Sequence, residues 1–132
     1  MPNTTYTNNK LLDAQHGKAT YTAPANIYAA LSTTTPTIAG GNFTEPSGNG
    51  YARVAVPAAS WASASGGSSA NTAAINFAAA SGSGWGTVTY MGFYDALTGG
   101  NLLSYDDLPA PQSVPAGVSP SVGIGQALDA LA

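Results

Sequence analysis

The segment from Thr87 to Tyr94 constrains the fold of this chain more than any other part of the sequence. Its β-branched and aromatic residues alternate with a period of two, with Val88 and Tyr90 on one face and Phe93 on the other. A half-buried strand has this period and this composition. Weaker strand patterns occur at residues 26–33, 51–56, 73–77, 101–105, 112–114 and 122–128. No central helix is indicated, so we predict an all-β fold, an antiparallel β-sandwich with long Gly/Ser/Thr loops.

The N-terminal residues show a different pattern from the rest of the chain. Residues 1–25 are predicted to form an arm that carries a short helix, and residues 26–132 are predicted to form the sandwich body. Either Asn8 or Asn9 can cap a helix over residues 10–16, because an Asn side chain accepts a hydrogen bond from the first free N–H groups.

Large apolar side chains are rare here, and five of them are the candidate protein-contact residues. Two turns of helix are not stable alone in water, so the two leucines of the predicted helix are expected to dock onto the body or onto a neighbouring protein. One phenylalanine lies in a long polar loop, and the two tryptophans are large enough to anchor an interface. These candidate contact residues are Leu11, Leu12, Phe43, Trp61 and Trp85.

The composition predicts a thin core. Ala, Gly, Ser and Thr make up just over half of the chain, and only 7% of the residues are charged, against roughly 25% in an ordinary soluble domain. Small side chains lose little entropy on burial and let chain segments approach closely. We therefore expect a subunit that gains stability by packing against other chains.

The same composition excludes several classes of function. Three cations cannot neutralise a run of phosphates, so no nucleic-acid partner is predicted. The chain has no Cys, which excludes thiol catalysis and thiolate metal sites. No apolar run approaches the roughly 20 residues of a membrane span, and the N-terminus lacks the pattern of a signal peptide, so no membrane partner is predicted.

No pattern typical of an active site is present. Asp13 and His16 are three residues apart on the predicted helix, but no Gly-X-Ser-X-Gly turn accompanies them. Glu45 is isolated from other acidic residues, so no pair of carboxylates for glycoside hydrolysis is visible. We predict that the protein is not an enzyme and has no catalytic residues and no cofactor.

Two weaker ligand hypotheses also give way to structural interpretations. Asp106 and Asp107 with Asp95 could gather oxygen ligands for calcium, but adjacent strand residues point to opposite faces, so capping of turns is favoured and no metal is predicted. Trp61 and Trp85 could form an aromatic platform for a sugar, although a tryptophan at the start of a strand is more often a core or interface anchor.

Three motifs together resemble a known family. They are GYAR at residues 50–53, WGTV at residues 85–88 and GFYDALTGGNLL at residues 92–103. As a set they are similar to a family of small tailed-bacteriophage virion proteins, described as head-decoration or tail-fibre proteins, over roughly residues 10–108. The resemblance implies a β-sandwich virion structural protein without enzymatic activity, and it transfers no catalytic residues.

The motifs also have a physical interpretation of their own. Tyr51 and Arg53 would share one face of a strand, where Arg53 could stack on an aromatic ring or pair with Asp95. Gly92 lies among bulky neighbours, which predicts room for a cross-strand ring or a bulge. Both interpretations give these residues a role in stabilising the fold.

Two functions follow from the resemblance and the composition. The first is a capsid decoration (cement) protein that binds the outer capsid and stabilises it, with the major capsid protein and copies of itself as partners and a trimer as a common arrangement. Its location would be the capsid exterior, after synthesis in the host cytoplasm. The alternative is a tail or tail-fibre component, located in the tail, that contacts glycans of the host surface.

Overall fold

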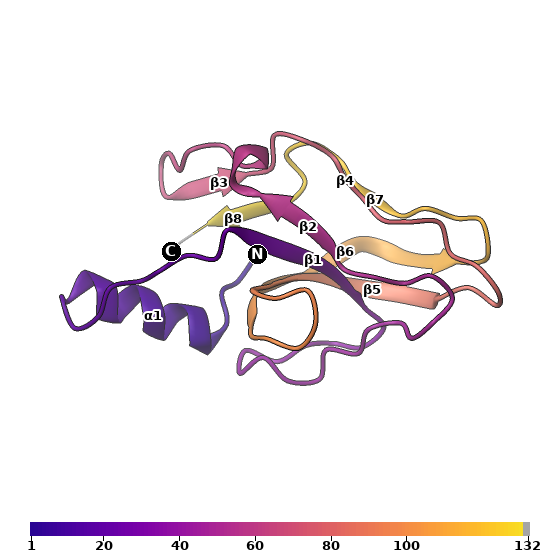
Figure 1. Cartoon of the computed structure of the whole chain (residues 1–132), viewed down its shortest axis with the longest axis horizontal. Helices are drawn as coiled ribbons and strands as arrows, with labels where there is room; N and C mark the ends of the chain where they lie inside the picture. Colours follow the sequence, from indigo (N-terminus) through magenta and orange to yellow (C-terminus); the bar gives the residue numbers. More distant parts are fainter. Residues whose placement is uncertain (131–132) are drawn as a thin grey trace.

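The computed structural model describes residues 1–130, and it is an all-β fold with one N-terminal helix (Figure 1). The strands pair in antiparallel fashion throughout, so the predicted fold class is confirmed. The elements in chain order are α1 (Thr5–Gln15), β1 (Asn26–Ser32), β2 (Val54–Pro57), the 3₁₀ turn η1 (Ala58–Ser60), β3 (Ser68–Ala70), β4 (Ile75–Asn76), β5 (Gly86–Tyr94), β6 (Leu102–Val114), β7 (Ser121–Val122) and β8 (Leu128–Ala130).

A four-stranded sheet with the order β2-β1-β5-β6 forms the centre of the protein. Strand β5 is the segment with the strongest sequence pattern, and it pairs with β1 on one side and with β6 on the other. Phe93, for example, stands opposite Ala29 of β1 and Ser104 of β6. The strand predicted over residues 87–94 is therefore confirmed, and the structure places it at the centre of the sheet.

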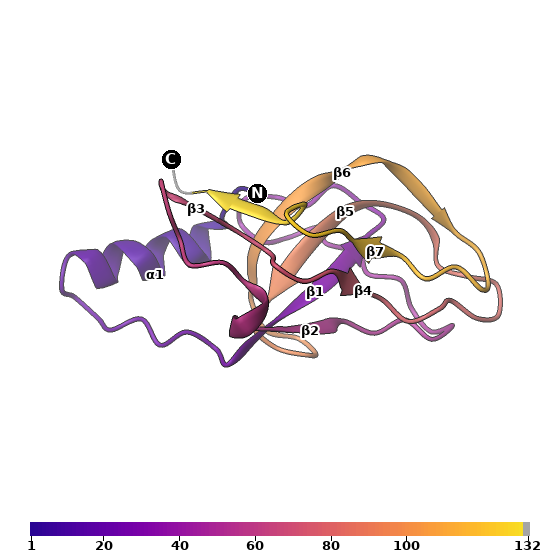
Figure 2. The same cartoon turned by 90° about the horizontal axis from the view of Figure 1, so that it is seen from above.

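Two short ribbons, β4–β7 and β3–β8, form a second layer over the main sheet. Figure 1 shows both ribbons on the same side of the β1–β5 pair, and Figure 2 shows the same arrangement from above. The core lies between the layers, where Ile75, Phe77 and Val122 join Leu31, Val88, Met91 and Phe93 of the sheet. The predicted sandwich is thus built from one sheet and two ribbons.

Strand β6 joins two segments that the sequence pattern separates. Between the pairs Val88–Gln112 and Tyr90–Asp107 the register shifts, so that residues 108–111 of β6 stand opposite a single residue of β5. Pro109 and Pro111 occupy this bulge, and proline has no N–H group to donate to a ladder. The prolines broke the sequence pattern, yet the strand continues on either side of them.

The segment of residues 61–71 forms a hairpin, although the sequence pattern indicates a Gly/Ser-rich loop. Trp61 pairs with Asn71, and Ser65 pairs with Ser68 across the turn at Gly66 and Gly67. A Gly-Gly pair suits the two-residue turn of a hairpin. The surrounding residues are Ala and Ser, which are weak strand formers, so the pattern of alternating apolar residues is missing there.

Helix α1 begins at Thr5, earlier than predicted, and Thr4 caps it in place of Asn8 or Asn9. The Thr4 hydroxyl accepts from the backbone N–H of Thr7 at 3.5 Å and donates to the carbonyl of Leu102 at 2.6 Å. The Thr7 hydroxyl donates to the carbonyl of Leu103 at 2.8 Å. Hydroxyl groups rather than leucines therefore attach the start of α1 to β6.

Candidate functional site

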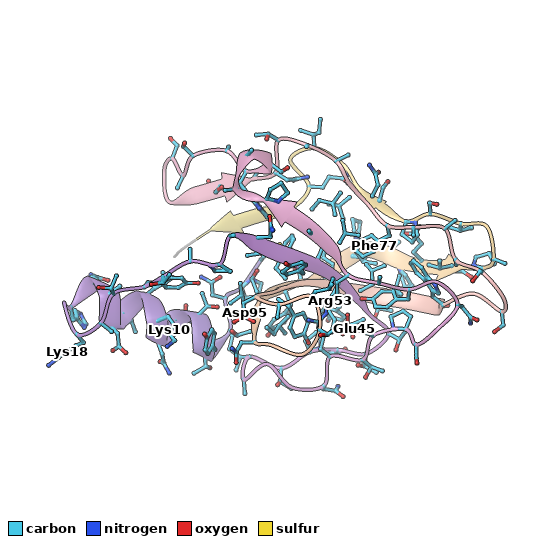
Figure 3. All side chains as sticks on the ribbon, in the orientation of Figure 1. Lys10, Lys18, Glu45, Arg53, Phe77 and Asp95 are labelled. Carbon is cyan, nitrogen blue, oxygen red and sulfur yellow. The ribbon has the colours of Figure 1, made fainter. Side chains whose placement is uncertain are left out.

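Arg53, which lies just before β2, makes four hydrogen bonds through its side chain. Its Nε and Nη2 donate to the two carboxylate oxygens of Glu45 at 2.9 and 2.8 Å, and its Nη1 donates to the carbonyls of Ala96 and Gly99 at 2.8 and 2.7 Å. The guanidinium lies 3.7 Å from the centre of the Tyr94 ring. Arg53 therefore joins the loop of residues 33–50 to the turn after β5 (Figure 3).

Tyr51 completes this cluster from the same segment as Arg53. Its hydroxyl donates to Glu45 Oε1 at 2.7 Å and accepts from the backbone N–H of Leu31 at 3.1 Å. The Arg53 side chain is 7% exposed and that of Glu45 is 24% exposed, so the ion pair is largely shielded from water. We call Glu45, Tyr51, Arg53 and Tyr94 the Arg53 cluster.

The electrostatics of the Arg53 cluster keep Arg53 charged and the tyrosines neutral. Burial raises the pKa of the Tyr51 phenol, and its hydrogen bond to Glu45 raises the pKa further. Burial alone would lower the pKa of Arg53, but the hydrogen bonds and the charge of Glu45 outweigh that effect, so the pKa of Arg53 is raised. Burial also raises the pKa of Tyr94, and the negative charge of Glu45 adds to the increase.

The predicted stacking of Arg53 on an aromatic ring is confirmed, whereas the predicted pairing with Asp95 is wrong. The Asp95 carboxylate instead accepts from the backbone N–H of Asn101 at 2.7 Å and from its side-chain amide at 3.1 Å, which closes the turn between β5 and β6. This is the turn-capping role predicted for the aspartates. Glu45 is isolated from other acidic residues in the sequence, and no spacing rule connects it to Arg53, so its pairing with Arg53 was not predicted.

Phe43 packs on the face of the sheet opposite the main core. Its ring meets the Tyr94 ring edge-on, with 5.3 Å between centroids. A Cβ atom on Gly92 would lie 2.7 Å from the Phe43 ring and 2.8 Å from a methyl group of Leu102. Gly92 therefore makes room for an aromatic ring, as predicted, and Phe43 is half-buried in this smaller cluster.

The two tryptophans differ in their surroundings. Trp85 is only 5% exposed, and its indole N–H donates to the carbonyl of Asn49 at 2.9 Å. It meets the Tyr51 ring edge-on at 5.2 Å, so it anchors the interior and does not offer a contact surface or a sugar platform. Trp61 is half-buried against Phe93, with 5.3 Å between ring centroids, and its indole nitrogen has no hydrogen-bond partner among the described residues.

An uncharged groove lies between α1 and the β3 hairpin. It consists of two adjoining hollows of about 400 and 520 Å³ that share Ile27, Ser69, Phe93 and Ser104. Leu11 lines the larger hollow and Trp61 the smaller one, and none of the residues that line either hollow carries a charged side chain. We call this the α1–β3 groove. It contains two of the five candidate contact residues.

Leu12 does not line the α1–β3 groove. It is 49% exposed on the neighbouring face of α1, whereas Leu11 is half-buried. The structure therefore separates two leucines that are adjacent in sequence and that were both predicted to dock onto the body or a neighbouring protein. Their different placement provides a matched pair of positions for testing the groove.

Residues 1–130 contain neither a metal site nor a membrane-spanning helix. Within this range no three His, Asp or Glu side chains are grouped so that they could hold a metal ion. The helix found in the same range is too short to cross a membrane.

The fold and the surfaces described above define a small all-β protein with a buried polar cluster and a neutral groove. A family model described as "Podophage GP4 fiber I protein gp80" matches residues 2–128. The chain belongs to this family, and it is a phage virion structural protein. The match includes residues 109–128, beyond the region in which the sequence motifs resemble tailed-phage virion proteins. Comparison with curated proteins finds no match.

Proposed function

We propose that this protein is a non-enzymatic structural subunit of a phage fibre, located in the tail. The observation that carries the proposal is the match of nearly the whole chain to a family whose description names a fibre protein. This is the alternative of the two functions that the sequence predicted. The composition, which suggested contact with other virion subunits, suits a fibre component as well as a decoration protein.

The α1–β3 groove supports the proposal because it is suited to contact with another protein chain. It is lined by Ile27 and Phe93 of the central sheet, together with Leu11 and Trp61. Because no charged side chain lines it, an uncharged apolar segment of a neighbouring virion subunit is the occupant that it fits. Burial of apolar area would provide the affinity, and such binding depends only weakly on salt.

The position of the protein on the particle tests the proposed function. We expect the site of an added label on intact virions, located by electron microscopy, to be in the tail region and to coincide with fibre density. Label over the facets of the head would overturn the fibre proposal and would favour capsid decoration.

A pair of leucine variants tests the groove separately. We expect Leu11→Ser to weaken reassembly of the purified protein with particles that lack it by about tenfold, because the buried contact of one leucine is lost. Leu12→Ser should leave reassembly unchanged, since Leu12 lies outside the groove. An equal effect of both substitutions, with both variants folded by circular dichroism, would show that the groove is not the contact surface.

A further inference from the structure

A separate polar pocket lies where α1 approaches the chain segment before β1 and the turn after β5. Its volume is about 380 Å³, and it is lined on its polar side by Tyr6, Lys10, Thr20, Tyr21, Thr22 and Asp95. We call it the Tyr6–Tyr21 pocket. It shares Tyr21, Ala23 and Pro24, but no charged side chain, with the α1–β3 groove. Its size is at the lower end of the range for ligand pockets, which suits a small ligand.

The two charged groups of the pocket have opposite signs and no ion-pair partner among the described residues. Lys10 Nζ lies 5.6 Å from the centre of the Tyr6 ring, and no carboxylate lies within ion-pair distance of it within residues 1–130. The Asp95 carboxylate is held in place by its two hydrogen bonds to Asn101. A carboxylate can accept about four hydrogen bonds, so Asp95 retains acceptor capacity.

Tyr6 and Tyr21 supply aromatic surface beside these charges. Both side chains are half-buried. Burial raises the pKa of the Tyr21 phenol, and the nearby Tyr6 and Asp95 raise it further, which agrees with a pocket where these three side chains gather. The Tyr21 phenol is therefore neutral at physiological pH, and the hydroxyl group of a tyrosine can both donate and accept a hydrogen bond.

The two opposite charges and the two aromatic rings of the pocket together favour one class of ligand. An anion would be repelled by Asp95 and a cation by Lys10, whereas a neutral polyhydroxyl ring can accept from the ammonium and donate to the carboxylate at the same time. The apolar C–H face of a sugar ring can pack on a tyrosine ring, as apolar groups do on aromatic side chains. We propose that the Tyr6–Tyr21 pocket binds one unit of a neutral saccharide.

The location of the pocket differs from the aromatic platform that the sequence suggested. Trp85 is buried and Trp61 lies against Phe93, so the two tryptophans do not form a platform. The tyrosines of the N-terminal segment provide the aromatic surface instead. The proposal concerns the purified protein and stands independently of its position on the virion.

Saturation-transfer NMR with the methyl glycosides of glucose, galactose and N-acetylglucosamine tests the proposal. We expect transfer from the wild-type protein to at least one glycoside. Lys10→Met and Asp95→Asn should each weaken that binding by about tenfold, because each removes a charge-assisted hydrogen bond. Lys18→Met is the matched control, since Lys18 does not line the pocket and lies beyond the end of α1, away from Lys10 and Asp95 (Figure 3).

The outcomes separate this inference from the proposed function. Loss of binding in Lys10→Met but not in Lys18→Met supports the saccharide site. Absence of transfer to all three glycosides, or equal binding by the wild-type protein and Lys10→Met, overturns it. Lys10 is exposed, so Lys10→Met decides the question even if Asp95→Asn does not fold. Neither result affects the position of a label on the particle, which tests the fibre proposal.

Discussion

Replacing Arg53 by methionine would test whether the Arg53 cluster holds the fold together. Methionine has a similar unbranched side chain and can still cover the Tyr94 ring, so the substitution removes mainly the charge and the donors. It would eliminate four hydrogen bonds, two to Glu45 and one each to the carbonyls of Ala96 and Gly99. Among the residues that the structure describes, the hydroxyl of Tyr51 would then be the one donor left to the carboxylate of Glu45.

The expected loss of stability follows from the burial of the Arg53–Glu45 ion pair. Removing one partner of a buried ion pair costs about 3–5 kcal/mol, because the other charge stays uncompensated. Glu45 is 24% exposed, so water can reach it, and we expect about 3 kcal/mol, at the lower end of that range. Small domains unfold with a free energy of roughly 5–15 kcal/mol. Arg53→Met should therefore remove a large part of the stability of this protein.

Urea unfolding followed by tryptophan fluorescence measures this loss, with Trp85 as a probe in the core. Lys18→Met is the control, and its free energy of unfolding should stay within about 0.5 kcal/mol of the wild-type value. In a double-mutant cycle with Glu45→Gln, the double variant should lose less than the sum of the single variants, because the two residues act as a pair. A cost below about 1 kcal/mol for Arg53→Met, the value of an exposed ion pair, would refute the reasoning.

Three further predictions concern the pH dependence, a close approach and the helix cap. The pKa of Tyr51 is raised above 10.0 in the folded state, so the unfolded chain loses this proton first as the pH rises above 10.0. The free energy of unfolding should therefore fall with pH in this range. In Tyr51→Phe, urea titrations should show a fall that is less steep by about 1.4 kcal/mol per pH unit. Gly84→Ala should be strongly destabilising in thermal melts, because Gly84 has a φ of +79° and a Cβ there would clash with the carbonyl of Val114. Gly117→Ala is the matched control: its Cβ would have free space, so it should lose only about 1–2 kcal/mol, the cost of the left-handed backbone. Thr4→Val should cost about 1–2 kcal/mol and should increase amide hydrogen exchange at the start of α1, because it removes the cap and the bond to β6; unchanged exchange would show that the cap does not hold the helix.

The strands with strong patterns could be predicted from the sequence, and the weak ones could not. Strand β5 follows the two-residue period of a half-buried strand, whereas its central place in the sheet is seen only in its pairing with β1 and β6. Strand β6 was divided because Pro109 and Pro111 interrupt the pattern, although the chain forms a bulge there and continues. The β3 hairpin was missed because Ala and Ser residues carry no clear period.

The sequence by itself determined the fold class and the family resemblance, since both depend on patterns of residues that are close along the chain. It offered Arg53 two partners, an aromatic ring or Asp95, and left the choice open. Only the tertiary structure decided that Glu45 pairs with Arg53, that Trp85 is buried, and that Tyr6 and Asp95 line one pocket. These contacts and this burial depend on the paths that the long loops of small polar residues take across the sheet. Such loops have no periodicity, so the contacts between them are decided by packing and hydrogen bonding in the folded protein and not by local spacing.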